Sequence, residues 1–285
     1  ETFPSPGYKY ISEILRGIRE MNEALPEDEK IRVHLVVVDR DLSLVYEHLK
    51  MLQKEIGPDA EDIQLPPLEE FKELSEEELV ELVDEFEAGG ELSGSILNEL
   101  STIRSSIHFS FAGGYSGGRS GMCMRLEAFS IREEAIAQNI QYLLQELNGA
   151  PLLVLFGSAH ATKCKAYTYI SKIPGAEEIP MWAQRLVEYG VDVYSLCTFC
   201  LSGRVGKGFI PISPNDIQFA DGTTLDSMLD EISDCNIIYI DLRSEPNRSI
   251  SLRLPSFKSE IPAGEMFDGL IVFREVTPVQ IEMES

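Results

Sequence analysis

The chain is poor in basic residues and in cysteine, and both shortages exclude classes of function. Its 24 lysines and arginines stand against 48 acidic residues, which gives a net charge of −24. Nucleic acids and anionic membranes repel such a protein, so neither is expected as its main partner. Five cysteines in 285 residues are few and odd in number, which disfavours a disulfide framework.

Long apolar runs are also missing from this acidic protein. No run approaches the roughly 20 residues that a membrane helix needs, and no signal peptide is recognisable. We therefore expect no membrane span and favour a cytoplasmic location, while the oligomeric state stays open. Apolar residues still make up 44% of the chain, so it has enough of them to bury a sizeable core.

Helical and strand-like patterns alternate along the chain. Helical spacing of apolar residues predicts helices within 10–25, 42–56, 75–86, 92–107 and 131–147. Short apolar runs predict strands within 31–39, 152–156, 191–199, 236–242 and 268–273. Because several of these runs lack in-out polarity, we expect an α/β protein with a mostly parallel central sheet and helices on both faces. We expect a single domain over residues 1–285, with 58–110 as a helical insertion or subdomain.

Polar side chains follow the ends of four predicted strands. Asp39, Asp241 and Glu275 end three strands or closely follow them, and His160 follows "LLVLF" by four residues in a tight G-x-x-H turn. Because ligands bind beyond the carboxyl ends of parallel strands, we expect these side chains to lie together. A histidine beside carboxylates can act as a general base on water, which makes His160, Asp39 and Asp241 the candidate catalytic residues. His160 and Asp39 could instead hold a divalent metal.

Several stretches resemble the erythromycin esterase-like proteins. "SIREEAIAQN" carries an R-E-x-x-I-A-x-N helix pattern from Arg132 to Asn139, and an apolar run and the turn to His160 follow it. "FDGLIVFREVTP", residues 267–278, is similar to the closing strand of that family. The G-x-x-H turn is shared with the wider superfamily of TraB/Tiki-like proteases and ChaN-like haem-associated lipoproteins. The esterase form carries an extra histidine and an asparagine in this turn, and the family's first motif, G-E-x-x-H, is not found in this chain.

The resemblance implies a hydrolase in which histidine-activated water attacks an ester or amide of a small-molecule substrate. Arg132 and Asn139 lie seven residues apart and so share one helix face, which the resemblance would direct at the site. Together with Glu275 they are the candidate substrate-binding residues. The resemblance to ChaN-like proteins implies an alternative, a non-catalytic protein that binds haem or a metal.

A glycine-rich segment suggests a further alternative. Gly113, Gly118 and Arg119 lie in "GGYSGGRS", one substitution from a phosphate-binding P-loop, after the strand-like "IHFSF". Nucleotide binding through this loop is therefore an alternative hypothesis, although arginine is a poor replacement for the P-loop lysine. A mobile loop that covers the site is the other interpretation.

Overall fold

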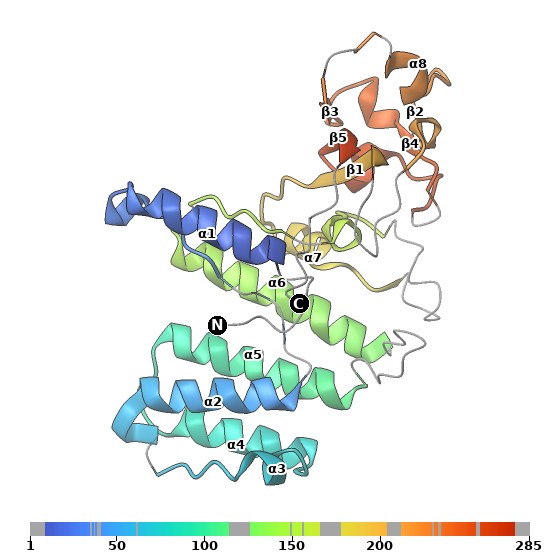
Figure 1. Ribbon diagram of the computed structural model, residues 1–285. Coiled ribbons are helices and arrows are strands. Elements are labelled where there is room, and N and C mark those ends of the chain that lie inside the picture. The colour runs from blue at the N-terminus through green and yellow to red at the C-terminus, as the bar shows by residue number, and fades with distance from the viewer. Residues whose placement is uncertain are drawn as a thin grey trace, which may run out of the picture.

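The computed structural model describes residues 9–34, 36, 38, 41–60, 62–113, 126–148, 150–155, 157–165, 178–203, 212–229, 231–232, 235–254 and 257–276. Helices occupy most of the first half of the chain, and the strands lie in its last third (Figure 1). No helix in these ranges is long and apolar enough to cross a membrane.

The N-terminal half forms helices where the apolar spacing predicts them. They are α1 (Lys9–Glu23), α2 (Leu42–Ile56), α4 (Glu76–Ala88), α5 (Gly94–Phe111) and α6 (Leu126–Glu146). The short α3 (Leu68–Phe71) lies outside the predicted helices. α4 begins at a capping box, in which the Ser75 hydroxyl accepts from the Glu78 backbone N–H and the Glu78 carboxylate accepts from that of Ser75. The helix predictions are thus confirmed, because helical periodicity is a local property of the sequence.

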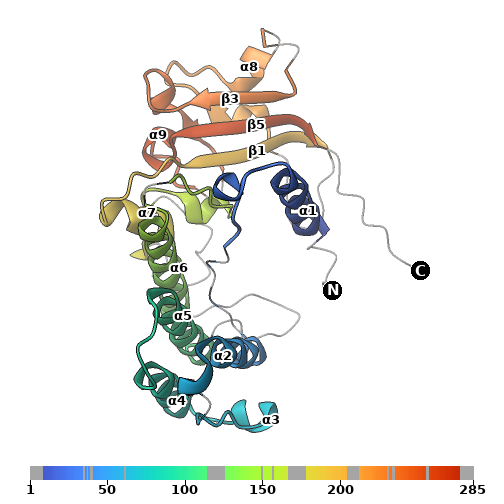
Figure 2. The same ribbon diagram turned by 90° about the vertical axis from the view of Figure 1, so that its left-hand side faces the viewer.

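Four of these helices enclose an apolar core of their own. Leu49 of α2, Phe71 of α3, Phe86 of α4 and Leu100 of α5 are fully buried in it. Burial of each such side chain contributes about 1.5–3 kcal/mol, which stabilises this acidic helical layer. Figure 2 shows the layer at the end of the molecule opposite the sheet. Because α2 shares this core, the insertion boundary at residue 58 stays a prediction.

The sheet is small and mixed. β1 (Leu196–Gly203), β5 (Gly269–Val276) and β3 (Ile237–Asp241) lie in the order β1-β5-β3. β1 runs parallel to β5, and β3 runs antiparallel to it. β2 (Ile217–Gln218) and β4 (Ser251–Leu252) form a separate antiparallel pair. The α/β class is confirmed, but the described strands do not form the mostly parallel sheet that the sequence predicts.

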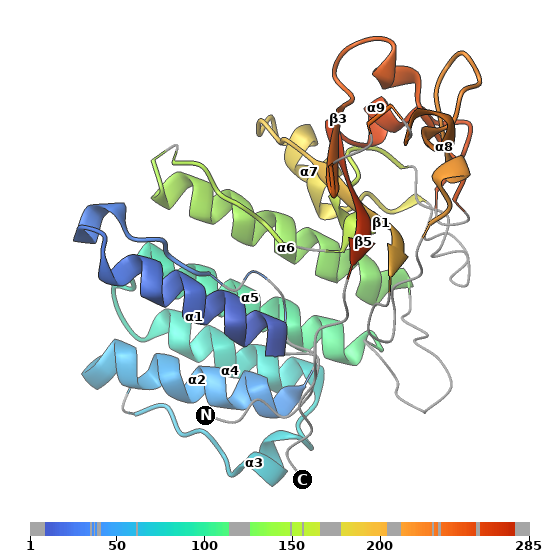
Figure 3. The ribbon, with the colours of Figure 1, turned by 45° about the horizontal axis from the view of Figure 1, so that its top comes forward.

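Short helices lie on both sides of this sheet. α8 (Leu225–Leu229) and α9 (Ala263–Met266) lie on one side of it, and α7 (Trp182–Glu188) lies on the other (Figure 3). Leu225 and Met266 pack with Leu270 of β5 in one buried cluster. α7 instead packs against α6 in a cluster that contains Trp182, Ile136 and Ile140.

Two predicted strands are not strands in the described part of the chain. Residues 31–34, 36, 38 and 150–155 pair with no strand there. Leu152 and Val154 pack against the cluster of α6 and α7, whereas Leu153 and Leu155 are 82% and 69% exposed. An unbroken apolar run predicts burial on both faces, and the structure buries only one.

Gly264 in α9 lies where the backbone leaves no room for a side chain. A Cβ there would lie 2.8 Å from the carbonyl oxygens of both Arg248 and Leu242. We expect Gly264→Ala to lower the free energy of unfolding by about 1–3 kcal/mol, because α9 must shift. In contrast, Gly17→Ala in α1, where a Cβ meets nothing within 4 Å, should stabilise the helix by about 0.5–1 kcal/mol. Urea denaturation of both variants measures the difference, and equal midpoints would contradict this packing.

Candidate functional site

His160 lies against a buried carboxylate from a different element. It belongs to a short 3-10 turn, η4 (Ser158–Ala161), in which its backbone N–H donates to the Gly157 carbonyl at 2.9 Å. The tight turn that the G-x-x-H spacing predicts is therefore present. Its Nδ1 lies 2.7 Å from Oε1 of Glu133 on α6. The Glu133 side chain is fully buried, and that of His160 is 18% exposed.

Glu133 occupies the apolar face of α6, where an unpaired charge would cost several kcal/mol. Phe129, Ile136 and Ala137 are its buried neighbours on that face. Two groups compensate the carboxylate. Oε1 contacts the His160 ring, and Oε2 accepts a hydrogen bond of 3.0 Å from the Trp182 backbone N–H at the start of α7. Packing of α6 against α7 thus fixes the carboxylate that faces His160.

An aromatic side chain also lies beside the His160 ring. The ring of Phe129, one helical turn before Glu133, lies 6.1 Å from the His160 ring, measured between centroids. Phe129 is itself buried in a cluster that includes Val38. A single face of α6 therefore supplies both the carboxylate and an apolar wall for the imidazole.

The contact determines which ring nitrogen can act as a base. The two atoms lie within ion-pair distance but are not aligned as a hydrogen bond. Because a carboxylate only accepts hydrogen bonds, this contact favours the tautomer with the ring proton on Nδ1, which leaves Nε2 as the basic nitrogen. Nδ1 is buried, so the exposed part of the side chain lies on its other atoms. This arrangement suits a general base whose charged form the carboxylate would stabilise.

A second carboxylate anchors the turn to the sheet. Asp268, just before β5, receives the Lys163 ammonium at 2.5 Å on Oδ1 and the Ser195 backbone N–H at 2.8 Å on Oδ2. The Ser195 hydroxyl in turn donates to the carbonyl of Ala161, the residue after His160. The Lys163 backbone N–H donates to the Met266 carbonyl at 2.9 Å. The histidine is thus held between α6 on one side and the sheet on the other.

Two of the predicted acidic residues lie far apart. Asp241 pairs with Gly269 at the start of β5, whereas Glu275 pairs with Ser202 near its end. At about 3.3 Å per residue, six residues of strand separate them by about 20 Å. The prediction that these two side chains meet is wrong, because β3 is antiparallel to β5 and its carboxyl end lies at the amino end of β5.

Asp241 pairs with an arginine. Arg243 donates to it from Nε at 2.9 Å, from Nη2 at 2.8 Å and from its backbone N–H at 3.0 Å. These hydrogen bonds lower the pKa of Asp241 from 3.8 to about 2. Because the pKa is lowered, the pair contributes stability above pH 3.8 and loses it as the pH falls through about 2. Asp241 as the partner of His160 therefore stays a prediction that no contact supports.

We expect Arg243→Ala to return the pKa of Asp241 from about 2 to near 3.8, because the carboxylate loses the hydrogen bonds from the Arg243 guanidinium. Titration of the Asp241 carboxyl carbon by NMR in the wild type and the variant measures this change. Arg248→Ala removes a nearby exposed arginine and should leave the pKa of Asp241 in place. An Asp241 that titrates identically in all three proteins would contradict the pairing.

Asn139 and Arg132 differ in their surroundings. The Asn139 amide is buried, where its Nδ2 donates to the Val36 carbonyl at 3.2 Å and its Oδ1 accepts from the Thr102 hydroxyl at 2.8 Å. Asn139 thus joins α5 and α6 to the segment that contains Val36. Arg132 is half-buried on α6, next to Glu133. Substrate binding by either residue, or by the exposed Glu275, stays a prediction.

The remaining predicted site residues lie outside the described residues or at the end of a helix. Asp39, Gly118 and Arg119 lie outside the described residues. Gly113, with φ of 86°, follows the end of α5, which runs through Phe111. The prediction of a strand before the glycine-rich segment is therefore wrong, and the strand that a P-loop requires is replaced by a helix.

Metal binding gains no support from the described residues. Among them, no three His, Cys, Asp or Glu side chains gather closely enough to hold a metal ion. A metal bound by His160 and Asp39 stays a prediction, since Asp39 lies outside those ranges. Cys197 and Cys200 form a C-x-x-C pair, a spacing that can bind a metal. Both lie on β1, where a separation of three residues places their side chains on opposite faces of the strand, so they do not converge on one ion.

Glu133 is the functional candidate that the strand-end analysis misses. Its signal in the sequence is an acidic residue in register with apolar ones, at helical spacing from Ile136, Ala137 and Ile140. Such a position should be apolar unless a buried partner compensates the charge. The sequence alone does not show that this partner is His160, which lies 27 residues further on.

The comparisons with known proteins give a fold relationship only. No family model matches the chain, and no curated protein matches it. Among solved structures, it is similar to a mutant of the erythromycin esterase EreC in its open conformation, with a TM-score of 0.54 and 11% sequence identity. The similarity covers 97% of this chain and 76% of the esterase chain. At this identity the likeness shows a common fold and leaves activity open.

Proposed function

We propose that this protein is a hydrolase in which His160, oriented by Glu133, activates water for attack on an ester or amide. The observation that carries the proposal is the 2.7 Å contact between His160 Nδ1 and the fully buried Glu133 carboxylate. A structural ion pair would gain little from burial of its acid, because desolvation offsets the attraction. Orientation of a base is a function that such a pair performs well.

The proposed reaction begins with proton transfer from water to Nε2 of His160. The resulting hydroxide adds to the carbonyl carbon, and the carbonyl electrons move to oxygen. When this tetrahedral intermediate collapses, the bond to the leaving alcohol or amine breaks and the imidazolium returns its proton to the leaving group. Glu133 stabilises the positive ring between these two transfers. Arg132 is our candidate for binding an anionic part of the substrate or of the intermediate.

The fold supports an ester as the first substrate class to test. EreC is an erythromycin esterase by its name, and this chain shares its fold at a TM-score of 0.54. We would incubate the protein with erythromycin and with a panel of aryl esters and anilides, and follow the products by mass spectrometry. Products one water heavier in total than the substrate, formed by the wild type and not by His160→Ala, would support the proposal. Equal conversion by both proteins would refute it.

A further inference from the structure

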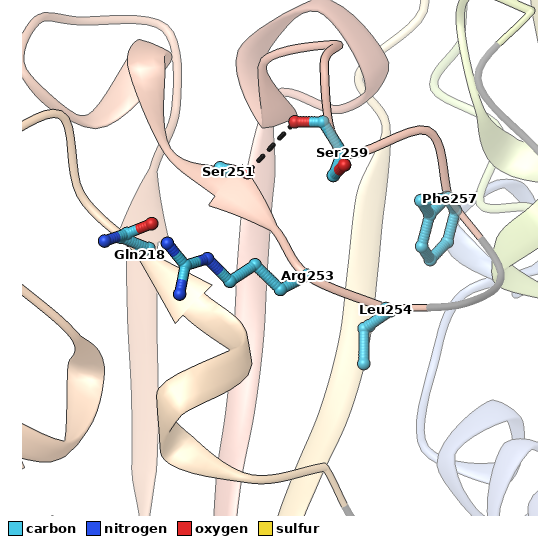
Figure 4. Close-up of a pocket in the computed structure, with 6 residues that line it drawn as sticks. All are labelled: Gln218, Ser251, Arg253, Leu254, Phe257 and Ser259. Carbon is cyan, nitrogen blue, oxygen red and sulfur yellow. Dashed lines mark hydrogen bonds between the residues drawn. The ribbon is translucent and has the colours of Figure 1, made fainter. Parts of the chain in front are cut away.

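A concave surface lies away from the His160 pair. It has a volume of about 670 Å³. It is lined by Gln218, Ser251, Arg253, Leu254, Phe257 and Ser259 (Figure 4). These residues belong to β2, to β4 and to the segment that follows β4. Figure 1 shows β2 and β4 at the end of the molecule remote from α6. None of the candidate residues of the catalytic site lines this hollow.

The sequence around the hollow reverses the charge balance of the chain. Residues 246–259 contain no acidic residue, although acids make up roughly one residue in six overall. The same stretch carries Arg248, Arg253 and Lys258, together with serine hydroxyls at 249, 251, 256 and 259. A cationic and hydroxyl-rich segment in a protein of net charge −24 is suited to an anion, and repulsion by charges beyond about 10 Å is largely screened at 0.1 M salt.

Hydrogen bonds hold the polar wall of the hollow in place. The Ser251 hydroxyl donates to the Ser259 carbonyl at 3.0 Å, as the dashed line in Figure 4 shows. Gln218 Nε2 donates to the Gly222 carbonyl at 3.2 Å. The Arg253 backbone N–H donates to the Asp216 carbonyl at 2.7 Å, and this hydrogen bond holds the backbone from which the Arg253 side chain extends. These bonds tie β2, β4 and the following turn into one rigid frame.

Arg253 is the cation within this frame. Its guanidinium extends towards Gln218 in Figure 4, while Leu254 and Phe257 form the other side of the hollow. Arg104, Arg185 and Arg243 each bind a carboxylate, whereas Arg19 and Arg248 share with Arg253 the lack of an ion pair within the described part of the chain, although neither lines the hollow. Among the described residues no carboxylate lies within ion-pair distance of Arg253, so its planar fork of donors faces the hollow without an internal anion.

We propose that this hollow binds the anionic group of a small organic molecule, a carboxylate or a phosphate. The Arg253 guanidinium would pair with two oxygens of that group, because its fork matches their geometry. The apolar part of the ligand would rest on Leu254 and Phe257, in line with sites that combine apolar walls with a few placed polar groups. The proposal does not depend on the hydrolase function of His160.

Calorimetric titration with phenyl phosphate, benzoate and inorganic phosphate tests this site, and the Arg253 side-chain Nε–H signal in NMR localises the binding. We expect saturable binding of phenyl phosphate or benzoate, weaker binding of inorganic phosphate, and a shift of the Arg253 signal. Comparison of the two aromatic probes identifies the preferred anion. Arg253→Gln should weaken binding about tenfold or more, and Arg253→Lys should restore only part of it.

Arg19→Gln serves as the matched control, because it removes the same charge from an exposed position on α1. It should bind the probes as the wild type does. Arg253 is exposed, so melting curves of its variants should match the wild type. Absence of saturable binding below about 10 mM for all probes, or equal affinity in Arg253→Gln, would overturn the proposal.

Discussion

His160→Ala is expected to slow ester hydrolysis by about 10²–10⁴-fold, the range over which a positioned general base accelerates proton transfer. The ring that would take the proton is lost, whereas the turn that carries it remains anchored through Lys163, Ser195 and Asp268. Because the fully buried Glu133 carboxylate loses its ring partner, we also expect the melting temperature to fall, while the anchored turn keeps the protein folded at the assay temperature. Initial rates and thermal melts of the purified variant measure both effects.

His48→Ala provides the matched control for this experiment. His48 on α2 also contacts a glutamate, with its Nε2 2.9 Å from Oε2 of Glu99 on α5, but this pair lies in the separate helical layer. Both variants remove an imidazole that contacts a glutamate, which is 40% exposed at Glu99 and fully buried at Glu133. A proposal based on His160 requires full activity in His48→Ala. An active His160→Ala variant would show that hydrolysis occurs elsewhere or by another route.

Glu133→Gln and Glu133→Ala should separate the effect of Glu133 on the His160 ring from its effect on the stability of the protein. Glutamine retains the shape and an acceptor for the Trp182 backbone N–H but carries no charge, so it should slow turnover about tenfold to a hundredfold with a modest loss of stability. Alanine removes the acceptor and leaves a buried donor unpaired, and should also lower the free energy of unfolding by about 2–4 kcal/mol. Rates and urea midpoints for the two variants give the comparison.

The adjacent residue Glu134 supplies the control for this pair of variants. Its carboxylate on α6 binds Arg185 of α7 and accepts from the hydroxyl of Tyr189, the residue just after α7. Glu134→Gln therefore perturbs the junction of α6 and α7 without touching His160. If Glu134→Gln and Glu133→Gln slow turnover equally, Glu133 acts only through the packing of these helices and not on the histidine.

Local patterns account for most of what the sequence predicts correctly. α2 and α4 follow from apolar spacing and from the cap at Ser75, and the turn to His160 follows from its glycine spacing, since each depends on residues within a few positions. The direction of β3 depends on long-range pairing with β5, which no local pattern encodes. This is why Asp241 and Glu275 fall at opposite ends of the sheet.

The site itself is predictable only in part. His160 stands out because histidines are few and its position follows an apolar run. Its partner, Glu133, comes from another element, and the choice among 48 acidic residues depends on how α6, α7 and η4 pack. A carboxylate that is fully buried is distinguished by its burial, which the sequence only suggests through the apolar neighbours at helical spacing.

The tautomer of His160 tests most directly whether Glu133 holds the ring as a base. Long-range nitrogen-15 to proton NMR correlations at neutral pH assign the proton to one ring nitrogen. We predict that Nδ1 carries it in the wild type, and that Glu133→Ala abolishes this preference while the tautomer of His34 is unchanged. A wild-type His160 that carries its proton on Nε2 would contradict the proposed role of the pair.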